Sequence, residues 1–354
     1  MTTPGLALSV IVPAYRCSDM LRASLAGLQA SDLRRAEWEL IVVDDGSADE
    51  TADVARSVAD RVITISGGPR GPANARNLGA VFARASILLF VDSDVVVAPS
   101  TLSGFVRAFR DQPDVTAVFG AHDESPRDER FVSQYRNLLH HYVHSVNAGD
   151  AVTFWAGCGA VRREEFFAIG GYDERRYPRP QIEDIELGYR LSSSGRRIVL
   201  APELQGTHLK SWTLTNMLRT DFRERAVPWM HLLLERGESI TDGPLNLQSR
   251  DKVMTLLSVA VVLSALLGLL THDARWLLIS ALAVIAVIAG NRAMFRWFAS
   301  VRGWNFAVRV VPMRLLFYWT SGLGALWAIL SHLDHPRFES RVPLKRADDS
   351  SLAA

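Results

Sequence analysis

Acidic side chains follow two apolar runs of the sequence, at the points where buried strands would end. Asp44 and Asp45 follow one run, and Asp92 and Asp94 follow another. Because the carboxyl ends of parallel strands meet at one edge of a sheet, we expect these carboxylates to converge there. Clustered carboxylates repel each other without a cation, and Asp-x-Asp offers oxygen ligands to a hard divalent ion that also holds a diphosphate. The pattern predicts such a site, with a capped turn as the alternative.

The elements that position these acids alternate between strands and helices. Apolar runs typical of buried parallel strands cover residues 8–12, 39–43, 61–65 and 87–91. Helical spacing separates them over 20–28 and 73–85, and Ser47 with Glu50 forms a capping pair that predicts a helix start near Ala48. This alternation predicts an α/β fold with a mostly parallel sheet and helices on both faces.

The C-terminal third has a different composition. Apolar runs without Asp, Glu, Lys or Arg cover residues 253–270, 276–290 and 315–333. A helix over the first nearly crosses a hydrocarbon core of roughly 30 Å, whereas 276–290 is short and also fits a buried core helix. We therefore predict a first domain over 1–240, a linker over 241–252, a transmembrane or interfacial helical region over 253–335, and a polar tail over 336–354.

Basic residues between the second and third runs predict the orientation. They are Arg292, Arg296, Arg302, Arg309 and Arg314, and no acidic residue lies among them. The positive-inside rule puts this loop, and by counting back the large N-terminal region, in the cytoplasm. Aromatic residues between the arginines suit an interfacial helix on anionic headgroups. The start, MTTPG, has no basic region of a signal peptide. We expect a multi-pass inner-membrane protein, with two or three spans left open.

Composition excludes several classes of protein. The chain has 354 residues with 39 Lys and Arg against 38 Asp and Glu, a balance that argues against general nucleic-acid binding. Hydrophobic residues make up 48% and charged residues 22%, which excludes a disordered chain. Two cysteines are too few for a disulfide scaffold or a thiolate zinc site. A protein of enzyme size remains.

Five ordered segments resemble the family 2 glycosyltransferases of GT-A fold. They are LSVIVPAYR (8–16), VVDDGS (42–47), GPANARNLG (71–79), VDSD (91–94) and IEDIELGYRL (182–191). The resemblance covers about residues 6–230. It implies transfer of a sugar from a nucleotide donor to an acceptor hydroxyl or phosphate, with Mg²⁺ or Mn²⁺ as cofactor.

The resemblance also implies roles for the donor side of the site. The residues concerned are Pro13, Tyr15, Asp44, Asp45, Arg76, Asp92, Asp94 and His208. Pro13 and Tyr15 would border the base, and Asp45 would accept a hydrogen bond from it. Asp92 and Asp94 would hold the metal ion, Asp94 more directly and Asp92 while facing the ribose or sugar. Arg76 would contact the nucleotide, with a helix-surface position as the alternative. His208 would complete the metal shell or touch the diphosphate, with a structural role as the alternative.

Glu183 and Asp184 resemble the acidic pair of the family, whose aspartate is the usual general base. A carboxylate near the acceptor can take a hydroxyl proton as the glycosidic bond forms. A Glu-Asp pair at a helix start is also commonly a partner of the helix dipole. If the acceptor is already a phosphate, Asp184 would instead orient it.

Further segments fit the acceptor side and the donor closure. Gly157, Cys158 and Gly159 resemble the glycine-rich acceptor segment, with a tight turn as the alternative and Cys158 as a packing residue. Histidines 140, 141 and 144 lie in a polar helical stretch without partner carboxylates, which predicts surface or acceptor-side positions. Processive synthases of the family carry Gln-x-x-Arg-Trp, a motif that is broken here, although Arg225 and Trp229 fit a related donor-closing role.

The predicted function is an inverting, metal-dependent transfer from a UDP- or GDP-linked sugar to a membrane-associated acceptor, a lipid-linked sugar or a glycolipid, in cell-envelope synthesis. Two alternatives remain open. One is a polysaccharide synthase or a component of one, and the other is a non-catalytic, membrane-tethered scaffold that binds nucleotide sugars. A dinucleotide-binding dehydrogenase is disfavoured because no Gly-x-Gly-x-x-Gly follows the first strand.

Overall fold

The computed structural model describes residues 5–237 and 249–332, which divide into two compact units between Trp212 and Thr213. This boundary falls before the predicted domain end at 240, because helices from residue 214 onward pack with the C-terminal helices. The predicted linker up to residue 248 and the tail over 336–354 lie outside the described residues.

The first unit begins with the predicted alternation. Strands β1 (Leu8–Ala14), β2 (Trp38–Asp44), β3 (Arg61–Thr64) and β4 (Ile87–Val91) pair in parallel in the order β3-β2-β1-β4. Helices α1 (Ser18–Gln29), α2 (Thr51–Arg56) and α3 (Pro72–Phe82) lie between them in the sequence, and a short turn, η1 (Arg35–Glu37), precedes β2. Each strand is therefore followed by a segment that returns the chain to the same edge.

Helix α2 begins at Thr51, later than the predicted start near Ala48. The Ser47 hydroxyl accepts a hydrogen bond from the main-chain N–H of Arg16 at 2.8 Å, and the N–H of Ser47 donates to Asp44. Ser47 therefore ties two strand ends together, and its side chain makes no cap for the helix.

The remaining strands make the described sheet a mixed one. They are β5 (Val95–Val97), β6 (Val115–His122), β7 (Gly149–Ala151), β8 (Cys158–Arg162) and β9 (Arg197–His208). The order continues β4-β8-β6-β9-β5, with β8 antiparallel to both β4 and β6. The predicted parallel arrangement thus describes the first four strands, and β8 brings residues 156–158 beside the end of β4.

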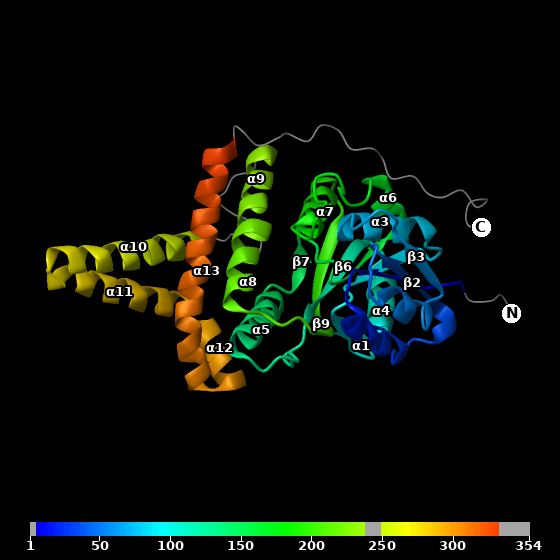
Figure 1. Ribbon diagram of the computed structural model, residues 1–354, viewed down its shortest axis with the longest axis horizontal. Helices are drawn as coiled ribbons and strands as arrows, with labels where there is room; N and C mark the ends of the chain where they lie inside the picture. The colour runs from blue at the N-terminus through cyan, green and yellow to red at the C-terminus, as the bar shows by residue number, and fades with distance from the viewer. Residues whose placement is uncertain (1–4, 238–248, 333–354) are drawn as a thin grey trace. The chain divides into compact units, whose positions relative to one another are not determined.

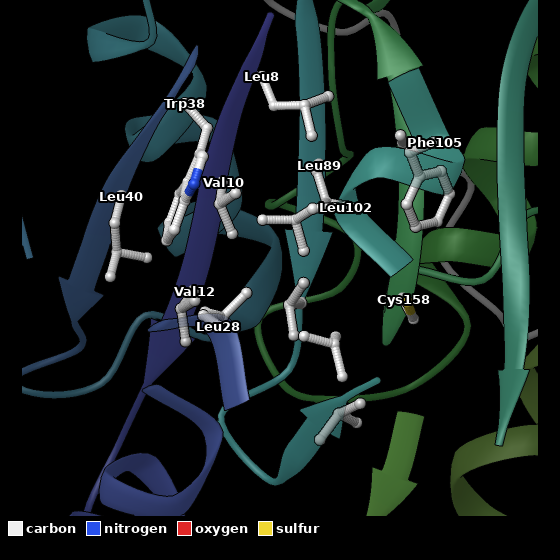
Figure 2. Close-up of a cluster of buried hydrophobic side chains, with 14 of the residues drawn as sticks. Leu8, Val10, Val12, Leu28, Trp38, Leu40, Leu89, Leu102, Phe105 and Cys158 are labelled. Carbon is white, nitrogen blue, oxygen red and sulfur yellow. The ribbon is translucent and has the colours of Figure 1, made fainter. Parts of the chain in front are cut away.

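Helices cover both faces of this sheet, as predicted. On one face α1 and α4 (Thr101–Asp111) pack with side chains such as Trp38 and Leu89 (Figure 2). On the other face α3, α6 (Arg163–Ala168) and α7 (Glu183–Ser193) bury Phe90 and Leu187. A long helix, α5 (Phe131–Val146), packs against β6 and β9. Burial of apolar area on both faces stabilises the layer that carries the strand ends.

The second unit is helical. It contains α8 (Leu214–Arg219), a π-helical turn η2 (Thr220–Ala226), α9 (Val227–Arg236), α10 (Ser249–Thr271), α11 (Ala274–Gly290), α12 (Arg292–Arg302) and α13 (Trp304–Ser331). Helices α10 and α11 lie side by side (Figure 1).

Two helices of the second unit, Arg250–Thr271 and Trp304–Ser331, are long and apolar enough to cross a membrane. A third candidate span arises if α11 and α12, bent by 71° at their junction, count as one. Leu256 and Leu270, 71% and 77% exposed, show how much apolar surface α10 presents. Soluble proteins rarely expose such a surface, so these helices suit an apolar environment.

Candidate active site

The Asp-x-Asp segment forms the turn that joins β4 to β5. The main-chain N–H of Val95 donates to the carbonyl of Asp92 at 3.0 Å, and the N–H of Asp92 donates to the carbonyl of Gly157 at 3.1 Å. The carbonyl of Asp94 accepts from Leu209, just after β9. Both aspartate side chains thus stand at the carboxyl end of a buried strand, where the sequence pattern placed them.

Arg76 joins this turn to the start of α7. Its Nη2 donates to Oδ1 of Asp92 at 2.7 Å, and its Nη1 donates to Oε1 of Glu183 at 2.9 Å. The side chain is only 5% exposed, so the surface position considered from the sequence does not occur. The face of Tyr172 lies 5.5 Å from the guanidinium. Arg76 is therefore a buried cation that holds two carboxylates of the site in place.

Asp184 lies in the first turn of α7, beside Glu183. Its Oδ2 accepts from the N–H of Ala156 at 3.1 Å, and its Oδ1 accepts from the N–H of Ile185 at 2.8 Å. Burial raises the pKa of the Asp184 carboxyl to about 7, with Glu183 raising it further and Arg76 opposing the shift. A carboxylate that titrates near neutral pH is well suited to general base catalysis.

The segment 156–157 connects the two acidic motifs. Ala156 donates to Asp184 while the next residue, Gly157, accepts from Asp92. A Cβ on Gly157 would lie 2.4 Å from the Trp155 ring, so only glycine lets the ring pack there. Residues 156–157 thus connect Asp92 to Asp184, while Arg76 connects Asp92 to Glu183, the residue before Asp184.

Cys158 lies in the same segment and is fully buried. Burial, together with the charge of Asp92, raises the pKa of its thiol to about 12. The thiol therefore stays protonated at neutral pH, and a side chain of this kind acts by packing. Gly159 lies on β8, where a Cβ would come within 2.3 Å of the Trp155 carbonyl.

The predicted base-binding residues gather at the ends of β1 and β2. Pro13 is buried in β1, whereas Tyr15 is 38% exposed just after it. The carboxylate of Asp45 accepts from the N–H groups of Arg70 and Gly71, at 2.8 and 2.7 Å. Burial raises the pKa of Asp45 although these bonds oppose the shift. Asp45 thus fixes the glycine-rich loop that leads into α3.

Asp44 lies beside Asp45 at the end of β2 and is fully buried. Its Oδ1 accepts from the N–H of Ser47 at 3.1 Å, while Oδ2 has no hydrogen-bond partner within residues 5–237 and 249–332. This oxygen keeps its acceptor capacity near the predicted base site.

His208, at the end of β9, faces the Asp-x-Asp turn. Its Nε2 lies 3.3 Å from Oδ2 of Asp94, and its Nδ1 lies 2.6 Å from Oδ1 of Asn137 on α5. Burial by itself raises the pKa of Asp94, but His208 and then Lys210 bring it below its ordinary value. Asp94 is therefore ionised at neutral pH and faces an imidazole nitrogen.

The other histidines differ from the sequence interpretation. His141 and His144 are buried, and Nε2 of His141 lies 3.2 Å from the carboxylate of Glu124. The predicted surface position and the expected lack of partner carboxylates were therefore wrong, and the acceptor-side position stays a prediction. The ring of His122 stacks on that of His208, with 4.5 Å between centroids, and on that of His140, with 4.0 Å between centroids. Sequence reasoning missed His122 and Asn137, because neither belongs to a motif.

The donor set at Asp94 and His208 fits a divalent cation. A carboxylate oxygen and an imidazole nitrogen 3.3 Å apart are both common ligands of Mn²⁺ and related ions. Among the residues that the structure describes, no group of three or more His, Cys, Asp or Glu side chains forms a closed metal cluster. Two protein ligands leave open positions, which is what a site that also binds a substrate diphosphate needs.

Residues 9–169 match the family described as Glycosyl transferase family 2. This segment contains the Asp-x-Asp turn, Arg76 and residues 156–157, and it ends just after α6. The segment is a family 2 glycosyltransferase domain.

Two relatives that are named as glycosyltransferases match parts of the chain. Validoxylamine A glucosyltransferase of Streptomyces hygroscopicus is 28% identical over 233 residues, which cover 56% of this chain and 54% of the relative. The chain thus spans about half the length of that relative. A second relative is the UDP-Glc:α-D-GlcNAc-diphosphoundecaprenol β-1,3-glucosyltransferase of Escherichia coli. It is 33% identical over 88 residues, which cover 24% of this chain and 34% of the relative.

One solved structure shares the GT-A fold. A mannosyltransferase of Pyrobaculum calidifontis, in complex with GDP-mannose and Mn²⁺, superposes with a TM-score of 0.56 at 20% identity, covering 90% of this chain and 87% of its own. The glycosyltransferase fold predicted from the sequence is confirmed. Arg225 in η2 and Trp229 in α9 belong to the second unit, and their donor-closing role stays a prediction.

Proposed function

We propose that this protein is an inverting glycosyltransferase that moves a sugar from a nucleotide sugar to a membrane-associated acceptor. The observation that carries the proposal is the fixed proximity of Asp184 to the Asp-x-Asp turn, through Arg76 and through residues 156–157. A general base beside a diphosphate site is the arrangement that a single displacement at an anomeric carbon needs.

Asp184 acts as the base in this proposal. Its oxygens are oriented by two main-chain N–H groups, and its pKa of about 7 lets it accept the proton of an acceptor hydroxyl at neutral pH. Glu183 is tied to Arg76 next to Asp184 and adds to the raised pKa of Asp184, of which burial is the main cause. The acceptor would lie along residues 157–159, where Trp155 fills the space that a Cβ on Gly157 or Gly159 would take.

The donor side uses the strand ends. Pro13 and Tyr15 border the base, Asp44 and Asp45 accept hydrogen bonds from the nucleoside, and Asp92 faces the ribose or the sugar. Asp94 and His208 would hold Mg²⁺ or Mn²⁺, which neutralises the charge of a departing nucleoside diphosphate. Arg225 and Trp229 would close over the donor.

The acceptor is proposed to be a lipid. The second unit supplies two or three apolar helices, and arginines cluster beside them on α12 and α13. A multi-pass position in the inner membrane, with the glycosyltransferase domain in the cytoplasm, brings the site close to lipid-linked sugars and glycolipids and raises their local concentration. The Escherichia coli relative is named for such a lipid-linked acceptor.

The test is donor turnover by the full chain in detergent. A panel of UDP- and GDP-linked sugars is incubated with Mg²⁺ or Mn²⁺, with and without polyprenyl phosphate or a lipid-linked sugar, and the released UDP or GDP is measured. We expect release that needs metal and lipid and that is lost in Asp94→Ala and Asp184→Ala. Asp53→Asn, an exposed aspartate on α2 paired with Arg56, is the matched control and should keep full activity. Donor binding without turnover would favour a non-catalytic scaffold instead.

A further inference from the structure

We infer that Asn137 is a positioning residue for His208. It keeps the proton of a neutral His208 ring on Nδ1, so that Nε2, the nitrogen that faces Asp94, can bind the cation. The inference rests on the proposed function, in which Asp94 and His208 hold the metal ion. Oδ1 of Asn137 lies 2.6 Å from Nδ1 of His208. An amide oxygen can only accept a hydrogen bond, so Nδ1 is the donor and carries the proton. In a neutral ring, Nε2 is then left with its lone pair toward Asp94.

The proton position matters because a metal ion binds only the unprotonated nitrogen of imidazole. The opposite tautomer would direct the N–H of Nε2 at the cation and leave no ligand there. Nε2 and Oδ2 of Asp94 are 3.3 Å apart, so without the ion a protonated Nε2 can donate to this carboxylate. A metal ion that displaces the Nε2 proton then finds a carboxylate oxygen and an imidazole nitrogen already facing it. Asn137 therefore prepares His208 as a ligand before the ion arrives.

The surroundings hold the ring in this orientation. His122 on β6 stacks on the His208 ring with 4.5 Å between centroids and 12° between planes. The main-chain carbonyl of His122 accepts from Nδ1 of His141, and α5 thereby attaches to the same strand. Three elements, β6, β9 and α5, thus fix the plane of His208, while Asn137 fixes its proton.

Burial argues that Asn137 is present for this contact. It is 2% exposed and is followed by two buried leucines, Leu138 and Leu139. A buried amide is unfavourable when its polar atoms lack partners, so an apolar residue would be favoured here if only packing mattered. Over the described ranges, the bond to His208 is the hydrogen bond that the Asn137 amide makes, and its Nδ2 has no partner.

The experiment measures Mn²⁺ binding rather than turnover. The full chain in detergent, alone and with saturating UDP or GDP, is titrated with Mn²⁺ while the paramagnetic resonance signal of free Mn²⁺ is recorded. We expect Asn137→Leu to weaken Mn²⁺ binding about 10- to 100-fold, the range seen when partners of metal ligands are removed. Asn137→Asp should restore binding, because a carboxylate accepts the same hydrogen bond but cannot donate one.

The control is Gln134→Leu, which removes another buried amide from α5. Gln134 donates to the main-chain carbonyls of Pro126 and Asp128, away from His208, so Mn²⁺ affinity should not change. Thermal melting verifies that each variant is folded, and Asn137→Ala replaces Asn137→Leu if the larger side chain prevents folding.

A double-mutant cycle separates this inference from the proposed function. His208→Ala should weaken Mn²⁺ binding at least as much as Asn137→Leu, and the double variant should bind no more weakly than His208→Ala alone. Unchanged Mn²⁺ affinity in a folded Asn137→Leu, alongside a loss in His208→Ala, overturns the role of Asn137 only. Unchanged affinity in His208→Ala removes His208 from the metal site, and the role of Asn137 falls with it. A wild-type chain that binds neither nucleotide nor Mn²⁺ contradicts the proposed function itself.

Discussion

Each of the two units buries an arginine beside one or more carboxylates. The two sites differ in the number of negative charges that surround the arginine. In the first unit Arg76 donates to Asp92 and Glu183, and Asp184 lies next in sequence to Glu183. In the second unit Arg314 on α13 pairs with one carboxylate, that of Asp251 on α10, at 3.2 Å.

The second pair is completed by neutral groups. The Tyr318 hydroxyl donates to Oδ1 of Asn291 at 3.0 Å and lies 3.4 Å from Oδ1 of Asp251. The rings of Phe317 and Tyr318 cover the Arg314 guanidinium at 4.4 and 4.5 Å. One positive and one negative charge therefore cancel where α10, α13 and the junction of α11 and α12 meet.

The difference indicates two uses of a buried arginine. Around Arg76, burial together with the negative charge of Glu183 raises the pKa of Asp184, and such perturbed groups are typical of functional sites. A balanced pair leaves no reactive group and locks helices together. The comparison predicts that the first site tolerates no apolar replacement, whereas the second does.

The largest expected effect comes from Arg76→Gln. Two carboxylates would lose their buried cation, and breaking a buried pair costs about 3–5 kcal/mol of unfolding free energy. We expect a lower melting temperature together with loss of sugar transfer, because Asp92 and Glu183 would no longer be held. Arg56→Gln, which removes an exposed pair with Asp53, should change the unfolding free energy by less than about 1 kcal/mol. A folded and active Arg76→Gln would refute the role of this arginine.

The second prediction concerns the pair in the helical unit. Asp251→Leu or Arg314→Met alone should lower the melting temperature in detergent strongly, since each leaves one buried charge without its partner. The double variant Asp251→Leu/Arg314→Met should melt near the wild-type temperature or above it, and donor turnover should persist. A double variant that is folded but inactive would show that this pair does more than join helices.

The third prediction is the pH dependence of the glycosyltransferase reaction. The pKa of Asp184 is raised to about 7, and a base must be ionised, so kcat/KM should rise about tenfold per pH unit below pH 7 and level off above it. The residual kcat/KM of Asp184→Asn should not rise with pH in this range. If the wild-type profile is flat between pH 5 and 8, the acceptor provides an oxygen that is already ionised, as a phosphate would, and Asp184 orients it.

The sequence predicts the first half of the fold and the acidic motifs well. Continuous apolar runs mark β1, β2 and β4, and placing the acids that end β2 and follow β4 needs only the rule that parallel strands end at one edge. By contrast, β8 is short and pairs antiparallel with β4. No periodicity in its sequence distinguishes this strand from a loop. Strand pairing between distant segments depends on tertiary packing, which a local pattern does not contain.

Some roles within the site could not be predicted for the same reason. Arg76 belongs to a recognisable segment of the sequence. Its two partners, Asp92 and Glu183, can be identified only from the positions of α3, β4 and α7 in the fold. His122 and Asn137 carry no motif at all. Two leucines, Leu138 and Leu139, follow Asn137 in the sequence, but that Asn137 is buried with them is known only from the structure.

The smallest expected effect comes from replacing Cys158, a buried residue beside Asp92, and it tests whether the Cys158 side chain acts only by packing. Cys158 is fully buried with its thiol pKa raised to about 12, so it carries no charge in the working pH range. Cys158→Ala removes one sulfur from a packed core and should cost about 1 kcal/mol of unfolding free energy, with turnover within about twofold of wild type. Cys158→Leu should be worse than Cys158→Ala, because extra volume there strains the strand that holds Gly157 against Asp92. If Cys158→Ala instead folds normally but transfers no sugar, the thiol takes part in the reaction. An uncharged buried group would then be reactive, and charge would not distinguish the reactive groups of this site from those that only pack.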